Sequence, residues 1–295
     1  MSTDFSKGAQ KSRRRRGRRA FDPDFSTLLT LCTLAALTPL LVLAHIKVGF
    51  LIPYAAYLLA LYVLLTLFGK LPHLFLSQKD MLTPRAFFRA LKNDAARARL
   101  ALPFGMLANL AFAAFRLVTG LFYRSFWFAA EAIYYIILSL IRCLLSKKET
   151  AAKEREAPER LALEWEAYRR TAQLLLLQDV SLGGIVLSVL LEEQTIIYPG
   201  YVLSISAIFT FFRVALSLRQ IARFRKKERP ALLSSKALSL CGSLLSVFTT
   251  QATVLSLCGA NPAVPILNAA TGGAAFLTLP VISFLMLKKA KRQET

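Results

Sequence analysis

Residues 109–131 read NLAFAAFRLVTGLFYRSFWFAAE, two apolar runs that meet at a short polar turn, YRS at 123–125. Each run carries one ionisable residue, Arg116 before the turn and Glu131 after it. At about 1.5 Å per helical residue both side chains lie roughly 10 Å from the turn, so two antiparallel membrane helices hold them at one depth. The sequence therefore predicts a helical hairpin in which Arg116 and Glu131 pair.

The composition indicates a multi-pass membrane protein. Of the 295 residues 55% are hydrophobic, and the mean hydropathy is +0.48. The apolar residues form blocks of about 17 to 25, which is the length that bilayer-spanning helices need. The net charge is +21, but the Lys and Arg residues lie between these blocks and not on one soluble segment. We therefore expect the lipid bilayer as a partner and exclude nucleic acid.

Residue types that build metal and catalytic sites are few and scattered. The four cysteines lie in or beside apolar blocks without C-x-x-C spacing, and neither His45 nor His73 has a companion at ligand spacing. The sequence contains no P-loop, nucleophile-elbow or H-E-x-x-H motif. Asp179 is the only Asp deep in an apolar block, so an aspartyl dyad is excluded. We expect no metal, no cofactor and no enzymatic activity.

Residues 1–27 form a basic, polar tail that we expect to be disordered. Its arginines, at 13–16, 18 and 19, directly precede the first apolar block and favour a cytoplasmic location for the tail. A twin-arginine export signal is the alternative, but no small-residue cleavage site follows. Contact with anionic lipid at the cytoplasmic face fits either interpretation.

The apolar blocks predict an all-α polytopic membrane bundle of about eight transmembrane helices. Their bounds are Leu28 to Ala44, Gly49 to Phe68, Ala101 to Phe122, Phe126 to Leu145, Thr171 to Leu191, Ile196 to Leu218, Leu232 to Leu257, and Ala263 to Leu287. With the N-terminus inside, the outer connections hold only Lys47 and Arg124 as basic residues, whereas every inner segment is strongly basic. The positive-inside rule thus predicts cytoplasmic N- and C-termini, and we expect a bacterial plasma membrane.

The chain divides into four expected parts. The tail (1–27) precedes an N-terminal transmembrane hairpin (28–68), a cytoplasmic amphipathic helix within 69–100, and a six-helix bundle (101–295). Within the bundle, a cytoplasmic helical connection at about 146–170 is expected to break near Pro158.

Three more ionisable residues fall within or near the ends of the later blocks: Asp179, Arg213 and Lys236. All three lie toward the cytoplasmic side, so a long basic side chain could reach the carboxylate and form a functional cluster. In the alternative, Arg213 and Lys236 extend to the inner interface and Asp179 hydrogen-bonds to Gln178 or to hydroxyls.

The seventh block carries polar residues at three- and four-residue intervals, which predicts one continuous polar face. Its principal members are Ser235, Ser239, Ser246, Thr249 and Thr253, with Gly242 between them. Such a face more often provides close packing and interhelical hydrogen bonds than a solute path.

The six blocks from Ala101 onward resemble the transmembrane domain of cation diffusion facilitators. That family's pattern of Asn, Lys, Gly, Ser and Asp fits Asn109, Arg116, Gly120, Ser125 and Glu131 without a gap. The metal ligands do not carry over, because the corresponding positions hold Tyr134, Leu138, Ser239 and Ser243. The chain also resembles a Firmicutes family of multi-pass membrane proteins through its YRSFW and YPGY segments, at 123–127 and 198–201.

The resemblance implies a cation-efflux-type six-helix bundle, preceded by two extra helices and lacking the zinc site. It favours a divergent transporter whose substrate it does not specify, with a homodimer as a further expectation. The alternative is a membrane scaffold or regulator whose basic cytoplasmic face contacts lipid or an acidic partner. An enzyme is the third and weakest hypothesis.

Overall fold

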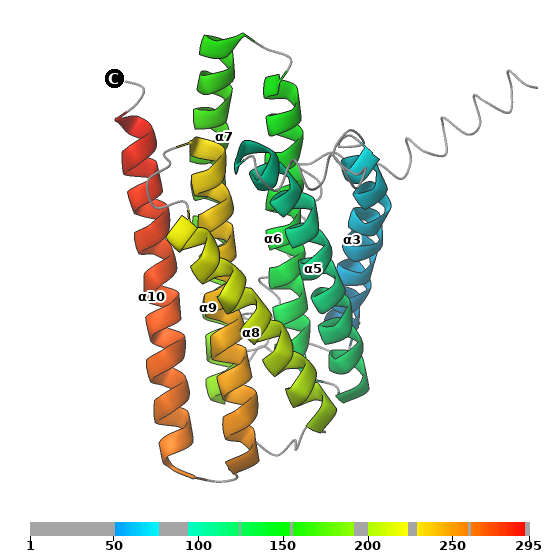
Figure 1. Ribbon diagram of the computed structural model, residues 1–295. Coiled ribbons are helices and arrows are strands. Elements are labelled where there is room, and N and C mark those ends of the chain that lie inside the picture. Colours follow the sequence, from blue (N-terminus) through cyan, green and yellow to red (C-terminus); the bar gives the residue numbers. More distant parts are fainter. Residues whose placement is uncertain are drawn as a thin grey trace, which may run out of the picture.

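The computed structural model describes residues 51–76, 94–123, 125–153, 156–191, 200–223, 229–258 and 261–292. Within these residues every regular element is helical (Figure 1). The helices are α3 (Leu51–Leu76), α5 (Asp94–Tyr123), α6 (Phe126–Lys153), α7 (Ala157–Leu191), α8 (Gly200–Arg223), α9 (Pro230–Leu255) and α10 (Ala263–Lys291). A 3₁₀ turn, Ser256–Cys258, extends α9.

Six of these helices, α5 to α10, are long and apolar enough to cross a membrane. They indicate an integral membrane protein that contacts the lipid bilayer, and they correspond to the last six expected blocks. The second block falls largely on α3, whose apolar stretch Leu58–Pro72 is shorter. The basic tail and the first block lie outside the described residues, so the expected count of eight stays a prediction.

Two expected boundaries differ from the observed helices. The start of α5 at Asp94 joins the end of the expected amphipathic segment directly to the following span, while residues 77–93 of that segment lie outside the described part. The connection at 146–170 consists mainly of extensions of α6 and α7, which project beyond the neighbouring helices (Figure 1). Pro158 fits in the first turn of α7, where a backbone N–H has no helical acceptor.

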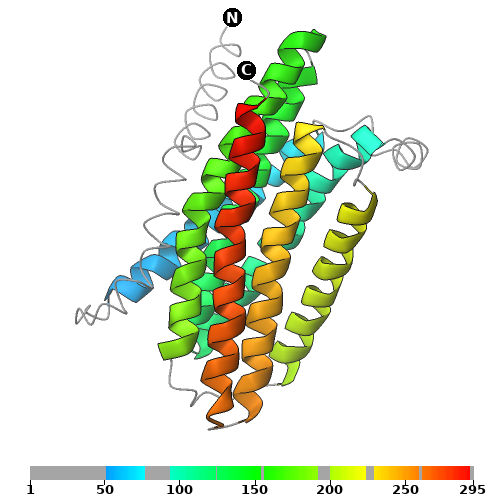
Figure 2. The ribbon, with the colours of Figure 1, turned by 90° about the vertical axis from the view of Figure 1, so that its left-hand side faces the viewer.

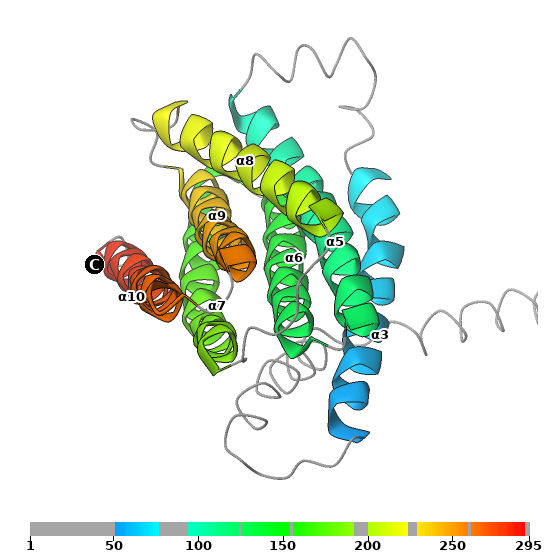
Figure 3. The same ribbon diagram turned by 90° about the horizontal axis from the view of Figure 1, so that it is seen from below.

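Helix α6 is at the centre of the bundle, and almost all of its side chains along the span are buried. It packs against α5, α7 and α9, and α3 lies at the edge against α5 and α6 (Figure 3). Helix α10 packs against α7 and α9, and runs beside α9 in Figure 2. Helix α8 packs mainly on α9 and crosses obliquely toward α5 (Figure 3).

Large apolar side chains remain exposed on the outer helices. On α8 they include Ile208 and Phe211, and on α10 Ile266 and Phe284, each with more than half of its surface exposed. Hydrocarbon chains of lipid cover such surfaces without the penalty that water would impose. Buried polar residues, among them Arg213 on α8 and Asn268 on α10, lie on the inward-facing sides of these helices.

Candidate functional site

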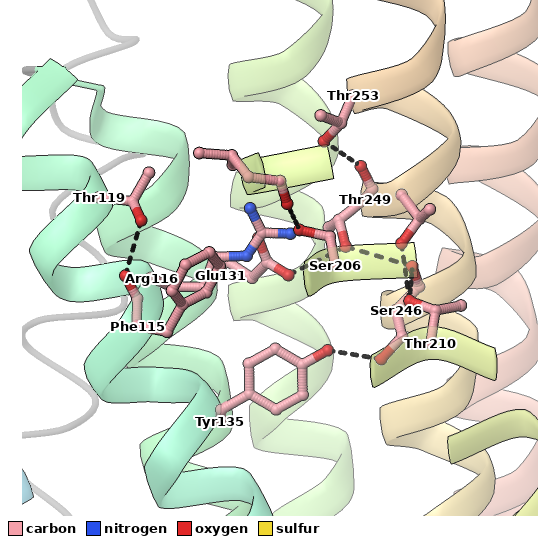
Figure 4. Close-up of polar contacts among 12 residues, drawn as sticks. Phe115, Arg116, Thr119, Glu131, Tyr135, Ser206, Thr210, Ser246, Thr249 and Thr253 are labelled. Atoms are coloured by element: carbon pink, nitrogen blue, oxygen red, sulfur yellow. Dashed lines mark hydrogen bonds and ion pairs between the residues drawn. The ribbon is translucent and has the colours of Figure 1, made fainter. Parts of the chain in front are cut away.

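The centre of the bundle contains the predicted ion pair. Arg116 Nε on α5 lies 2.9 Å from Glu131 Oε2 on α6, and both side chains are fully buried (Figure 4). Thr249 on α9 donates a hydrogen bond of 2.9 Å to the other carboxylate oxygen, Oε1. The guanidinium of Arg116 also lies 4.6 Å from the ring centre of Phe128. The structure confirms the pairing expected from the hairpin, which turns between Tyr123 and Phe126.

A second buried arginine, Arg213, enters the same region from α8. One of its terminal nitrogens donates a hydrogen bond to Asn109 Oδ1 on α5. Its guanidinium carbon lies 5.1 Å from the ring centre of Tyr135 and 5.3 Å from that of Phe209. The close approach of Arg213 to α9 requires Gly242, because a Cβ there would stand 1.5 Å from Nη2.

A third buried arginine, Arg142 on α6, was not singled out by the sequence. It is 3% exposed and donates a hydrogen bond of 3.1 Å to Ser239 Oγ on α9. The guanidinium also lies against Gly105, where a Cβ would be 2.8 Å from Nη1. The signal that could have found it is helical spacing: Glu131, Tyr135 and Arg142 share one face of α6.

The polar face predicted on α9 follows this row of residues along the helix. From the N-terminal end of α9, Ser239 bonds Arg142, Gly242 accommodates Arg213, and Thr249 bonds Glu131. Between them, Ser246 and the Tyr135 hydroxyl share a hydrogen bond of 2.7 Å (Figure 4). Of the remaining predicted members, Ser235 is buried, and Thr253 donates a hydrogen bond to the Thr249 carbonyl of its own helix.

The expected cluster of Asp179 with Arg213 and Lys236 is not observed. Arg213 bonds Asn109 and is buried, so it neither pairs with Asp179 nor extends to the interface. Asp179 on α7 is 7% exposed, and its Oδ1 has no hydrogen-bond partner in the described part of the chain. Its neighbour Gln178 donates to the Tyr134 carbonyl instead. Lys236 is half-buried near the start of α9, within electrostatic range of Lys289.

Not every charged residue inside the described part of the bundle has an oppositely charged partner. Arg116 has a carboxylate partner, whereas Arg142 and Arg213 have no carboxylate within 4 Å among the described residues. The two unpaired guanidinium groups lie within electrostatic range of each other. The site is therefore a polar row along α6 and α9, with an excess of positive charge toward the N-terminal end of α9.

The described residues contain no group of three or more His, Cys, Asp or Glu that could hold a metal ion. No protein-family model, curated protein or solved structure matches the chain. The resemblance to cation diffusion facilitators thus stays a prediction. Two residues that this predicted resemblance places at ligand positions lie near guanidinium groups: Tyr134 is within electrostatic range of Arg213, and Ser239 accepts a hydrogen bond from Arg142.

Proposed function

We propose that this membrane protein is a transporter and that the polar row between α5, α6, α8 and α9 is part of its solute path. One observation carries the proposal: Arg142 and Arg213 are buried in the bundle without carboxylate partners. A charged side chain at membrane depth costs at least about 2.5 kcal/mol, and such residues typically mark solute or ion pathways.

The arrangement of the row supports the same function. Packing alone explains the Arg116–Glu131 pair, because the two charges neutralise each other. It does not explain two further cations from different helices that approach each other in the same interior. Their partners Asn109 and Ser239 are neutral, so neither offsets the charge. A scaffold gains nothing from this repulsion, whereas a solute of opposite charge would relieve it.

The proposal includes several elements that rest on the sequence. The bundle is of the cation-efflux type without a zinc site, the protein lies in a bacterial plasma membrane with both termini cytoplasmic, and it is not an enzyme. The basic inner segments face anionic lipid, and two copies form a homodimer. The excess of basic residues at one end of the bundle supports this orientation.

Transport is tested with the full chain reconstituted into liposomes on a solid-supported membrane. Rapid exchange to solutions of inorganic phosphate, acetate, potassium or manganese would reveal a charge-moving solute as a transient current. We expect a current for at least one solute, its loss in Arg142→Gln, and its retention in Arg219→Gln, which removes an exposed arginine from α8. If no solute gives a current or a tracer flux above protein-free liposomes, the transporter proposal fails.

A scaffold remains the second candidate because of the basic extension of α6 and α7. There Lys148 Nζ lies 3.1 Å and Arg170 Nη2 lies 2.6 Å from the same Glu166 oxygen. Both basic residues line a cavity of about 240 Å³ between the two helices, together with Leu145 and Leu174. A basic rim over an apolar cleft fits an anionic lipid. Retention of phosphatidylglycerol by the wild type, and its loss in Lys148→Gln, would favour this candidate if no transport is found.

A further inference from the structure

We propose that Arg142 and Arg213 together bind an oxyanion, either a carboxylate or a phosphate group, inside the bundle. This inference rests on the proposed function, because it names the chemical class of the solute that the polar row receives. Oxyanion binding and transport are separate properties, and each has its own experiment.

The interior of the bundle carries an excess of positive charge. Among the described residues, the interior contains three buried guanidinium groups, those of Arg116, Arg142 and Arg213, and two buried carboxyl groups, those of Glu131 and Asp179. Glu131 lies beside Arg116, and Asp179 forms no ion pair within the described residues. Since arginine stays protonated in proteins, the excess cannot be removed by loss of a proton. An anion between Arg142 and Arg213 would remove it.

Several buried polar groups around the two arginines lack a hydrogen-bond acceptor among the described residues. Arg142 Nε, Asn109 Nδ2 and the Tyr134 hydroxyl are buried, and none has a hydrogen-bond partner in the described structure. All three are donors. Asn109 uses its oxygen to accept from Arg213, which leaves its NH₂ group oriented by that bond and free to donate. A buried donor without an acceptor costs about 1 to 3 kcal/mol, so a shared acceptor would satisfy several groups at once.

The donors also belong to one connected region. Arg213 bonds Asn109 and lies within electrostatic range of Tyr134 and Cys241. Arg142 lies within electrostatic range of the same Cys241. The buried Cys241 thiol therefore lies near both guanidinium groups, and the residue after it, Gly242, supplies the space that Arg213 uses.

An oxyanion fits this region better than a halide or a cation. The planar guanidinium presents parallel N–H groups that match the two oxygens of a carboxylate or phosphate. Arg213 is also held against the rings of Tyr135 and Phe209, which reduces the freedom it would lose on binding. A cation would meet two like charges. Asp179, the remaining carboxylate, lies on α7 within electrostatic range of Tyr134 and Cys241, and it forms no ion pair with either arginine in the described structure.

Binding is measured on the purified full chain in nanodiscs by thermal unfolding. At constant ionic strength, chloride is replaced stepwise by inorganic phosphate in one series and by acetate in another. We expect a saturable rise in the unfolding temperature with at least one oxyanion, as ligand binding to the folded state requires. The apparent affinity should fall at least about tenfold in Arg142→Gln and in Arg213→Gln, since each removes charge-assisted hydrogen bonds. The control Arg219→Gln should bind as the wild type does.

A second variant keeps the test decisive if the arginine variants fail to fold. Tyr134→Phe removes only an unpartnered hydroxyl, so in chloride it should unfold at the same or a higher temperature than the wild type. Its apparent affinity for phosphate or acetate should be several-fold lower than that of the wild type. Ser283→Ala is the matched control, because it removes another buried, unpartnered hydroxyl on α10. Equal oxyanion response in the wild type and Tyr134→Phe, or no response in the wild type, overturns the inference.

The two proposals fail in different ways. Oxyanion binding that depends on Arg142 but leads to no current or flux supports this inference and overturns transport. A current that depends on Arg142 without oxyanion binding supports transport and overturns this inference. A difference between the phosphate and acetate series identifies which oxyanion the site prefers.

Discussion

The guanidinium of Arg213 occupies the space that a side chain at Gly242 would need: a Cβ at 242 would lie 1.5 Å from Nη2 and 2.5 Å from the guanidinium carbon. The same arginine bonds Asn109 on α5. The glycine thus permits α8, α9 and α5 to meet around one charged group.

Gly242→Ala should lower the stability of the protein. Alanine is the better helix former by about 1 kcal/mol, but here the added methyl displaces Arg213, and crowding a packed interior typically costs about 1 to 3 kcal/mol. We expect a lower unfolding temperature in detergent. Gly273→Ala on α10, where a Cβ meets nothing within 4 Å, is the control and should be neutral or stabilising. Equal effects of the two substitutions would contradict the placement of Arg213.

The Arg116–Glu131 pair should show strong and unequal coupling. Removing one partner of a buried pair costs about 3 to 5 kcal/mol. Glu131→Gln should be the more damaging change, because arginine keeps its charge whereas the carboxyl left by Arg116→Met can take up a proton. The double variant should regain much of the loss.

A double-mutant cycle of unfolding free energies measures this coupling. Strictly additive single effects would mean that the two side chains do not touch. Lys148→Gln combined with Glu166→Gln provides a comparison, since that pair is one third exposed and should couple only weakly.

Replacement by leucine should have different effects on the stability of the protein at two buried asparagines. Asn109 accepts a hydrogen bond from Arg213, so Asn109→Leu leaves a charged donor unsatisfied and should destabilise by about 1.5 to 3 kcal/mol. Asn268 on α10 is fully buried, and neither its Oδ1 nor its Nδ2 has a hydrogen-bond partner among the described residues. Asn268→Leu should therefore be neutral or stabilising in the same unfolding assay. Destabilisation by Asn268→Leu comparable to that of Asn109→Leu would show an essential polar role on α10.

The proposed orientation predicts which ends of the bundle react with an impermeant thiol reagent. In a background without the four native cysteines, Asn261→Cys between α9 and α10 should react from outside intact cells. Glu159→Cys, at the exposed start of α7, should react only after the membrane is opened. Labelling of both in detergent controls for reactivity. Reaction of Glu159→Cys in intact cells would reverse the topology.

Local features of the sequence were sufficient to predict the hairpin and the polar face of α9. The turn at 123–125 places Arg116 and Glu131 at one depth, and depth decides pairing when two helices are joined by so short a turn. The face on α9 follows from helical spacing alone. Both predictions use only residues that are close along the chain or on one helix.

The partners of Arg213 and Asp179 could not be predicted in this way. Depth along separate helices does not tell which helices are adjacent or which way each one faces. In the structure α7 and α8 lie on opposite sides of α9, so Asp179 and Arg213 are separated despite similar depths (Figure 3). Arg142 was missed for another reason: it lies near the end of its predicted block, next to a segment expected to be cytoplasmic, where basic residues are common as topology signals.

Helix α8 combines a buried charge with the weakest packing among the six spans, since most of its side chains face outward. Among the described residues, its links to α5 include the Arg213–Asn109 bond, the stacked rings of Phe112 and Phe209, and the hydroxyl contact of Tyr123 with Tyr201. Displacing α8 along the membrane normal would carry the Arg213 charge through the transmembrane field. A full crossing of one charge corresponds to about 2.3 kcal/mol per 100 mV, so even a partial displacement would make the position of α8 sensitive to voltage.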